Sequence, residues 1–219
     1  MPEQLPDNGG GHPVPEALAV AAGLAGFALC SHQGLPWIIA GATGFLLAAS
    51  TLGWSLVRVP RPAALLGFAS CSRRIAFFTA GGCVLGLGLG GLHRWRLGLP
   101  LAPVGGLEAF AALACLIGAT EELVYRGWLQ GRLRELGWPV AVLGAAVAHA
   151  GYKTLLFAWP GEAAPVNLLV IGFWTVTGGV FFGWLREFSG SLLPPLFAHA
   201  VFDLMTYGAV ARAPWWVWT

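Results

Sequence analysis

Charge is the property that this sequence has least of, and its scarcity excludes several classes of protein. Only 10% of the 219 residues are Asp, Glu, Lys or Arg, a single residue is lysine, and the formal net charge is +2. Nucleic-acid-binding proteins carry basic runs or patches, and no basic run is present, so we expect no nucleic-acid partner. The four cysteines include no C-x-x-C pair, which argues against a zinc cluster or a disulfide scaffold.

Apolar residues dominate the rest of the chain. They make up 57% of it, and the mean hydropathy of +0.70 is well above that of soluble domains. A helix needs about twenty mostly apolar residues to cross a bilayer. Stretches of that length occur near residues 16–32, 36–57, 74–92, 107–128, 138–158, 165–185 and 191–210. The sequence therefore predicts an all-α bundle of about seven transmembrane helices.

The predicted spans follow one another with only short loops between them. We expect one transmembrane domain over residues 16–219, preceded by a short disordered segment at residues 1–15. Glycines crowd the third predicted span at residues 81–91. Small residues let membrane helices approach closely, so this stretch predicts a helix-packing surface.

The arginines between the spans predict an orientation. If the N-terminus is cytoplasmic, eight arginines fall on the cytoplasmic side of the membrane and three on the opposite side. Cytoplasmic segments carry an excess of Lys and Arg, so this distribution favours a cytoplasmic N-terminus. The abundance of Ala, Gly and Arg indicates a bacterial protein, which we expect in the inner (cell) membrane as a multi-pass protein.

Two adjacent glutamates near the end of the fourth predicted span are the most informative feature of the chain. A charged side chain deep in a bilayer costs roughly 2.5 kcal/mol or more, so intramembrane carboxylates indicate function. Glu122 and Arg126 are four residues apart and share a helical face, which predicts a structural ion pair. Glu121 is rotated by about 100° from Glu122 in an α-helix. We therefore expect Glu121 to be available for chemistry.

Three further polar side chains lie inside predicted spans. His149 is in the fifth, and His199 and Asp203 share a helical face in the seventh. At 1.5 Å per residue, Glu121, His149 and His199 lie roughly 10, 16 and 12 Å from the cytoplasmic ends of their spans. We therefore expect one polar cavity within the last four spans, opening towards the cytoplasm. A packing role for each side chain is the alternative, and Lys153 could either reach for the interface or balance Asp203.

These residues resemble the three motifs of the CPBP family of CAAX proteases and bacteriocin-processing enzymes. The double glutamate with Arg126, a membrane histidine some thirty residues later and the final His199-x-x-x-Asp203 cover about residues 107–207. The resemblance implies a glutamate-type intramembrane endopeptidase acting on a membrane-associated peptide or protein. It also implies that Glu121 is the general base, that His149 helps to activate a water, and that His199 and Asp203 stabilise the oxyanion.

Two positions depart from the family pattern. Ala145 stands four residues before His149, where the family usually has phenylalanine, and Asp203 stands where it usually has asparagine. An ionised aspartate only accepts hydrogen bonds. Asp203 must therefore be protonated, orient His199, or take another role.

Other functions remain open from the residues alone. Peptide hydrolysis needs a base for water and a donor for the oxyanion. The chain has no Gly-x-Ser-x-Gly sequence, which disfavours a serine nucleophile, and we expect no cofactor. Zinc is nevertheless an alternative, because Glu121, His149, His199 and Asp203 are all acceptable ligands. A proton-coupled transporter, or a non-catalytic scaffold or immunity relative, would also place acids and histidines inside the membrane.

Overall fold

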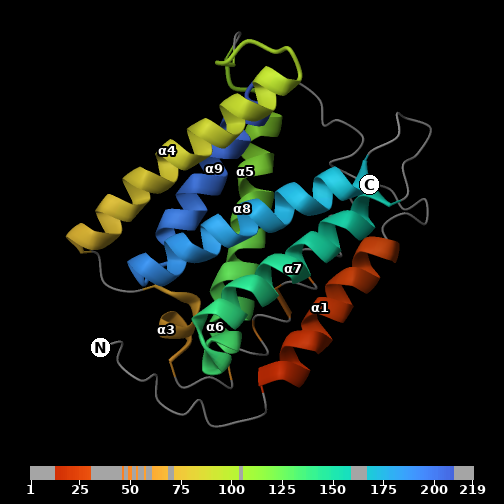
Figure 1. The fold of residues 1–219 in the computed structure, drawn as a ribbon, viewed down its shortest axis with the longest axis vertical. Helices are drawn as coiled ribbons and strands as arrows, with labels where there is room; N and C mark the ends of the chain where they lie inside the picture. The colour runs from red at the N-terminus through yellow and green to blue at the C-terminus, as the bar shows by residue number, and fades with distance from the viewer. Residues whose placement is uncertain are drawn as a thin grey trace.

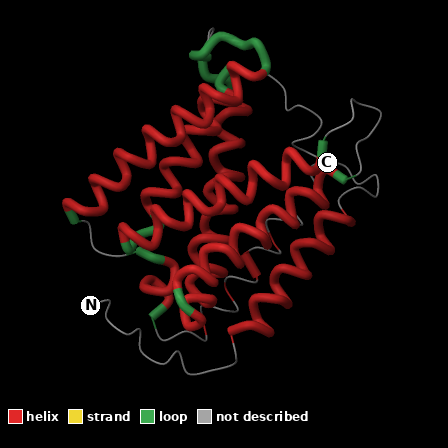
Figure 2. The backbone as a smooth tube through the Cα atoms, viewed as in Figure 1, coloured by secondary structure: helices red, strands yellow, loops and turns green. Residues whose placement is uncertain are grey.

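The computed structural model describes most of the chain, and its regular structure there is helical throughout (Figure 2). The described ranges are residues 13–30, 61–68, 72–103, 106–158 and 167–209, with isolated positions between 46 and 57. The all-α prediction is confirmed for these ranges. Nearly all of the second predicted span, and the first twelve residues, lie outside them. Residues 13–15, predicted to be unstructured, form the first turn of a helix.

The helices follow the predicted spans with shifted ends (Figure 1). In chain order they are α1 (Pro13–Cys30), α3 (Pro62–Leu66), α4 (Arg73–Arg96), α5 (Ala109–Glu121), a π-helix (Glu122–Leu129), α6 (Gln130–Leu133), a 3-10 turn (Arg134–Leu136), α7 (Trp138–Phe157), α8 (Leu168–Ser189) and α9 (Leu193–Tyr207). By length and composition, α4, α7 and α8 can each cross a membrane. The described residues thus establish a helical membrane protein, and the predicted number of seven spans stays a prediction.

The outer faces of these helices are apolar. Large hydrophobic side chains are exposed along α4, α7, α8 and α9, among them Phe77, Leu143, Val147, Phe173 and Phe197. A soluble protein rarely leaves so much contiguous apolar surface in water. This surface is that of an integral membrane protein.

The bundle is arranged as two closely packed helix pairs that meet at an angle (Figure 1). Helix α4 lies along α9, and α7 lies along α8, with α5 behind α9 and α1 at the outer edge of α7. Helices α4 and α8 are close together at the start of α4 and the end of α8, and they diverge towards their other ends. The two helices therefore form a V, which is wide where α4 ends and α8 begins.

Glycines bring α4 against α9, as the glycine-rich third span predicts. Gly82, Gly86 and Gly90 recur every four residues and face α9. A Cβ atom on Gly82 would lie 2.6 Å from the carbonyl oxygen of Pro194, and one on Gly86 would be closer still to that of Ala198. Only glycine permits this approach. The close contact holds α9, which carries His199 and Asp203, in place.

Buried polar contacts close the narrow end of the bundle. Arg186 of α8 donates to the carbonyl oxygens of Leu65 (2.6 Å) and Gly127 (3.4 Å), and Gln130 donates to the carbonyl oxygen of Gly183 (3.0 Å). Buried polar groups are costly unless they are paired, so these bonds stabilise one arrangement. They fix α3 and the π-helix against α8.

Candidate active site

The two glutamates lie where α5 changes into the π-helix. Helix α5 ends at Glu121, and the wider turns of the π-helix run from Glu122 to Leu129. The sequence predicted ordinary α-helix here, so this is a difference in local structure. A π-helix bonds each residue to the fifth one along instead of the fourth, and such segments are frequent at functional sites. Both carboxylates point into the bundle, with exposures of 7% for Glu121 and 0% for Glu122.

Glu122 and Arg126 connect the two histidines. Glu122 Oε1 lies 2.9 Å from Arg126 Nη1, in the spacing that the sequence predicts. The same Arg126 nitrogen lies 2.9 Å from His149 Nδ1, and the same Glu122 oxygen lies 2.9 Å from His199 Nδ1. The ion pair is therefore the centre of a chain of contacts that runs from α7 through the π-helix to α9.

These contacts determine which ring nitrogen of each histidine carries a proton. Arginine only donates, so Nδ1 of His149 must accept, and the proton of the neutral ring is on Nε2. Ionised Glu122 only accepts, so Nδ1 of His199 donates, and Nε2 of its neutral ring is bare. The partner of one ring nitrogen sets the chemistry of the other. The Glu122–Arg126 ion pair thus favours a protonated Nε2 in neutral His149 and an unprotonated Nε2 in neutral His199.

Glu121 stands between these imidazoles. Its Oε2 atom lies 3.3 Å from Nε2 of His149, without the alignment of a hydrogen bond, and 3.9 Å from Nε2 of His199. Its Oε1 atom forms an ion pair with Nζ of Lys153. The structure therefore brings side chains from three helices together around Glu121. It also decides the position of Lys153, which forms an ion pair with Glu121 and, among the described residues, none with Asp203.

Asp203 lies beside this group without bonding to it. Its Oδ2 atom is 3.9 Å from Nε2 of His199, which is too long for a hydrogen bond, and has no hydrogen-bond partner among the described residues. Gly118 of α5 makes room for it, because a Cβ atom there would clash with Asp203 Oδ2 and lie 3.1 Å from His199 Cδ2. In this arrangement Glu122, not Asp203, holds the ring of His199.

Tyr125 is a residue of this site that the sequence did not indicate. Its ring is stacked on His149, with 4.4 Å between centroids and 20° between planes. Ala145, one turn before His149 on α7, is buried in the same apolar cluster. A small side chain at that position leaves space next to the imidazole, and Tyr125 is the aromatic side chain that packs on the ring. No spacing rule connects residue 125 to residue 149, so only the tertiary structure could reveal this pair.

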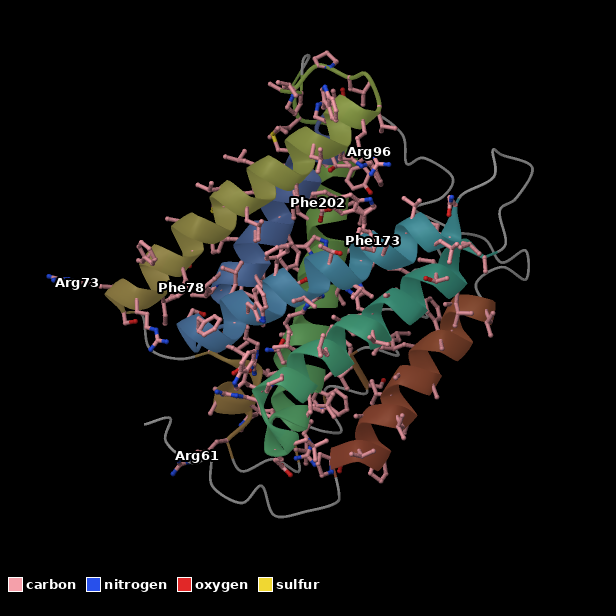
Figure 3. All side chains as sticks on the ribbon, viewed as in Figure 1. Arg61, Arg73, Phe78, Arg96, Phe173 and Phe202 are labelled. Atoms are coloured by element: carbon pink, nitrogen blue, oxygen red, sulfur yellow. The ribbon has the colours of Figure 1, made fainter. Side chains whose placement is uncertain are left out.

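A cavity of about 600 Å³ leads to the polar group from the wide end of the V. Glu121, His149 and His199 lie at its inner end, and Lys153 lies one turn nearer its mouth on α7. Figure 3 shows Arg96 at the end of α4 and Phe202 on α9, and both residues line the cavity. The outer wall is mostly apolar and includes Leu89 and Leu92 from α4, Leu97 directly after it, Phe157 from α7, Asn167 directly before α8, Val170, Ile171 and Trp174 from α8, and Tyr207 from α9.

The cavity differs from the prediction in two respects. Helix α4 supplies part of its wall, so it is not confined to the last four predicted spans. It also extends towards the end of α4 and the start of α8, which is the non-cytoplasmic side in the orientation that the arginines favour. The predicted cytoplasmic opening is therefore wrong for that orientation. Counting residues predicted that the polar group is nearer to the cytoplasmic ends of its helices. The space between the polar group and those ends is filled by buried side chains such as Trp128, Leu129 and Val142.

The site contains carboxylate and imidazole side chains, which are types of group that can coordinate a metal ion, but their arrangement is not that of a metal site. Among the described residues, no group of three or more His, Cys, Asp and Glu side chains is disposed to hold a metal ion. The Nδ1 atoms of His149 and His199 are engaged by Arg126 and Glu122. The inner end of the cavity instead presents one carboxylate, two imidazoles and one ammonium group to a small polar molecule.

Comparison with known families agrees with the motif resemblance. Residues 103–205 match the family described as type II CAAX prenyl endopeptidase Rce1-like. Neither the comparison with curated proteins nor that with solved structures gives a match. The matched segment contains both glutamates, Arg126, both histidines, Lys153 and Asp203. Residues 103–205 therefore form an Rce1-like domain of the CPBP family, which is a family of membrane proteases.

Proposed function

We propose that the protein is an intramembrane endopeptidase that hydrolyses a peptide bond of a membrane-associated protein or peptide with a water activated by Glu121. The observation that carries this proposal is the position of Glu121 Oε2, which lies 3.3 and 3.9 Å from the Nε2 atoms of two histidines at the inner end of the cavity. A water there would be within hydrogen-bond reach of a base and of two groups that orient it.

The reaction follows from these positions. Glu121 takes a proton from the water, and the water oxygen bonds to the peptide carbonyl carbon. The carbonyl oxygen then carries a negative charge until the C–N bond breaks, and Glu121 returns its proton to the departing amine. His149 can donate its Nε2 proton to the water, because that nitrogen has no hydrogen-bond partner among the described residues. His199 and Asp203 border the position of the reacting carbonyl. The products are a carboxylic acid and an amine, which become a carboxylate and an ammonium group when the acid proton passes to the amine, and no co-reactant is needed.

Glu122 and Arg126 act through the histidines in this proposal. Neither residue takes part in the proton transfers of the proposed reaction. Arg126 contacts Nδ1 of His149, and Glu122 contacts Nδ1 of His199. A catalytic histidine held by a fixed partner keeps one tautomer and one orientation. The pair therefore has a positioning role as well as the structural role that the sequence suggested.

The surroundings of the site favour a membrane-associated substrate. The cavity lies between α4 and α8, whose other faces expose large apolar side chains, and its own outer wall is mostly apolar. An extended peptide segment delivered at the membrane surface or from within the bilayer could enter it. We place the protein in the inner (cell) membrane of a bacterium with its N-terminus in the cytoplasm, on the strength of composition and arginine distribution.

Cleavage of a defined peptide by the purified protein tests the proposal. The probe is a farnesylated peptide ending in a CAAX sequence, compared with the same peptide without the lipid, in detergent micelles and with products identified by mass spectrometry. The parent protein should cleave at least one of them, and Glu121→Gln should reduce cleavage by several orders of magnitude while the melting temperature stays close to that of the parent. Undiminished cleavage by Glu121→Gln would refute the glutamate mechanism.

A chelator separates the zinc alternative from the water mechanism. Activity that is unchanged after dialysis against a chelator is the expected result. If activity is lost and returns on addition of zinc, the carboxylate and histidines act as ligands, and the metal alternative is correct. A protein that cleaves neither peptide, while binding them, would favour a non-catalytic scaffold.

A further inference from the structure

We infer that Lys153 is the group that stabilises the oxyanion, and therefore a catalytic residue of the proposed hydrolysis. This inference rests on the proposed function and assigns a role that neither the motifs nor the family match contains. Lys153 is the single lysine of the chain, and it lies inside a helix that is long and apolar enough to cross the membrane. An ammonium group in such a place is costly unless it has a function or a partner.

The position of Lys153 suits this role. It follows His149 by one turn of α7, so both side chains leave the same face of that helix. Its ammonium group pairs with Oε1 of Glu121, whereas both histidines approach Oε2. The two carboxylate oxygens of Glu121 thus have different neighbours, with Lys153 at Oε1 and the histidines at Oε2. A water at Oε2 and a carbonyl oxygen at the ammonium group would be neighbours, because the two carboxylate oxygens belong to one group.

Lys153 is also accessible to a substrate. Its side chain is 23% exposed and lines the cavity, while the side chain of Glu121 is 9% exposed. An ammonium group has three donors, and the contact with Glu121 uses one of them. Two donors remain for a peptide carbonyl that enters from the mouth of the cavity.

The other polar groups around Glu121 are poorly suited to donate to an oxyanion. Nε2 of His199 is bare when the ring is neutral, because Nδ1 then carries the single ring proton and donates it in a hydrogen bond to Glu122. Asp203 can donate only if it is protonated, because an ionised carboxylate only accepts. The Nε2–H group of His149 has no hydrogen-bond partner among the described residues, but it lies 3.3 Å from Glu121 Oε2, where the proposed water would accept from it. Arg126 is 1% exposed, with Nη1 shared between Glu122 and His149. Lys153 needs no change of protonation to act.

The movement of charge during the reaction supports the assignment. Before the reaction, the negative charge next to Lys153 is on Glu121. When Glu121 accepts the water proton, it becomes neutral and the negative charge appears on the former carbonyl oxygen. An ammonium group beside both positions remains paired throughout, and a fixed cation at the developing charge is an effective means of lowering the barrier. When the tetrahedral intermediate collapses, the proton passes to the amine and the charge returns to Glu121.

Replacing the ammonium group by an apolar side chain of similar length tests the inference. Lys153→Met should lower kcat by about 10²–10³-fold, as the removal of one oxyanion donor does, with little change in KM. Lys153→Arg keeps the charge and should retain more activity than Lys153→Met. Arg73→Met is the matched control, because it removes one exposed cation at the far end of α4 from the cavity (Figure 3) and should leave kcat unchanged.

A transition-state analogue distinguishes this role from mere positioning of Glu121. The probe is a phosphonate version of the test peptide, in which an anionic tetrahedral phosphorus replaces the reacting carbonyl. Its dissociation constant should rise about as much as kcat falls in Lys153→Met, because both report the same contact. A kcat within threefold of the parent, or a large loss of kcat with unchanged phosphonate binding, would overturn the inference.

The outcomes separate this inference from the proposed function. Suppose that the parent and Lys153→Met both cleave the peptide, whereas Glu121→Gln does not cleave it. In that case only the role assigned to Lys153 is wrong. If the parent neither cleaves the peptide nor binds the phosphonate, both proposals are refuted. Melting temperatures measured in the same detergent show whether each variant is folded.

Discussion

At the scale of single residues, the adjacent glutamates have different surroundings, so their substitution should have different effects. Glu121 faces the cavity and contacts an ammonium group and two imidazoles, whereas Glu122 is fully buried against Arg126 and His199. The proposed roles follow this division. Glu121 performs chemistry, and Glu122 holds the groups around it.

Glu122→Gln should destabilise the protein more than Glu121→Gln. It leaves the Arg126 guanidinium as a buried charge without its counter-ion, and breaking a buried pair in this way costs about 3–5 kcal/mol. Thermal unfolding in detergent should show a clearly lower melting temperature for Glu122→Gln and a nearly unchanged one for Glu121→Gln. If Glu122→Gln were stable but inactive while Glu121→Gln cleaved peptide, the two roles would be exchanged.

Asp203→Asn should retain or raise activity at neutral pH. Asp203 Oδ2 makes no hydrogen bond with the described residues and lies 3.9 Å from His199, so the carboxylate is not what holds that ring. An amide occupies nearly the same volume and always supplies a donor. Peptide cleavage across a range of pH, with and without a chelator, checks this. A loss of more than a hundredfold in a folded protein would instead assign Asp203 to orienting His199 or to binding a metal.

At the scale of helices, the contact of α4 with α9 positions half of the site. Gly86 faces the backbone of α9, whereas Gly88 has no atom within 4 Å of a Cβ position. Gly86→Ala should therefore destabilise the protein by roughly 1–3 kcal/mol, as overpacking does. It should also reduce cleavage, because α9 carries His199. Gly88→Ala is the control on the same helix, and it should leave both melting temperature and activity unchanged or slightly improved. Equal effects of the two would contradict the packing role of Gly86.

The π-helix is the element that no pattern in the sequence indicated. Residues 107–128 read as one apolar span with glutamates near its end, and both α- and π-helices satisfy that description. The change at Glu122 lets residues 121 to 126 supply groups to α7 and α9 at once. Helix type here depends on contacts with neighbouring helices, which local sequence does not specify.

At the scale of the whole molecule, the cavity opens at the end of the bundle opposite to the larger group of arginines. The mouth of the cavity is at the ends of α4 and α7, while the narrow end carries Arg132, Arg134 and Arg186. If the arginine-rich end is cytoplasmic, substrates reach the site from the opposite side of the membrane or through the bilayer. The direction of access is therefore tied to the orientation.

Labelling of engineered cysteines should determine this orientation. In a background without the four native cysteines, Leu101→Cys and Arg73→Cys place exposed thiols at opposite ends of α4. A membrane-impermeant maleimide added to intact cells should label Leu101→Cys and leave Arg73→Cys unlabelled, with lysed cells as the control for reactivity. The reverse pattern would invert the predicted topology and make the cavity open towards the cytoplasm.

The amino-acid sequence by itself determined the class of the protein and the members of its polar group. Long apolar stretches require helices in a membrane, and charges or imidazoles within them are too costly to be accidental. Helical rise alone placed Glu121, His149 and His199 at similar depths. These conclusions depend on composition and spacing, which are local properties of the chain.

Only the tertiary structure decided how these groups are connected. Contacts between helices paired Lys153 with Glu121, placed Tyr125 on His149 and gave each histidine a different protonated nitrogen. The angle between α4 and α8 decided at which end the cavity opens. Each of these features is set by the relative rotation and tilt of helices that are distant in the sequence. Their apolar faces pack by shape, and shape complementarity cannot be read from hydrophobicity along one chain segment.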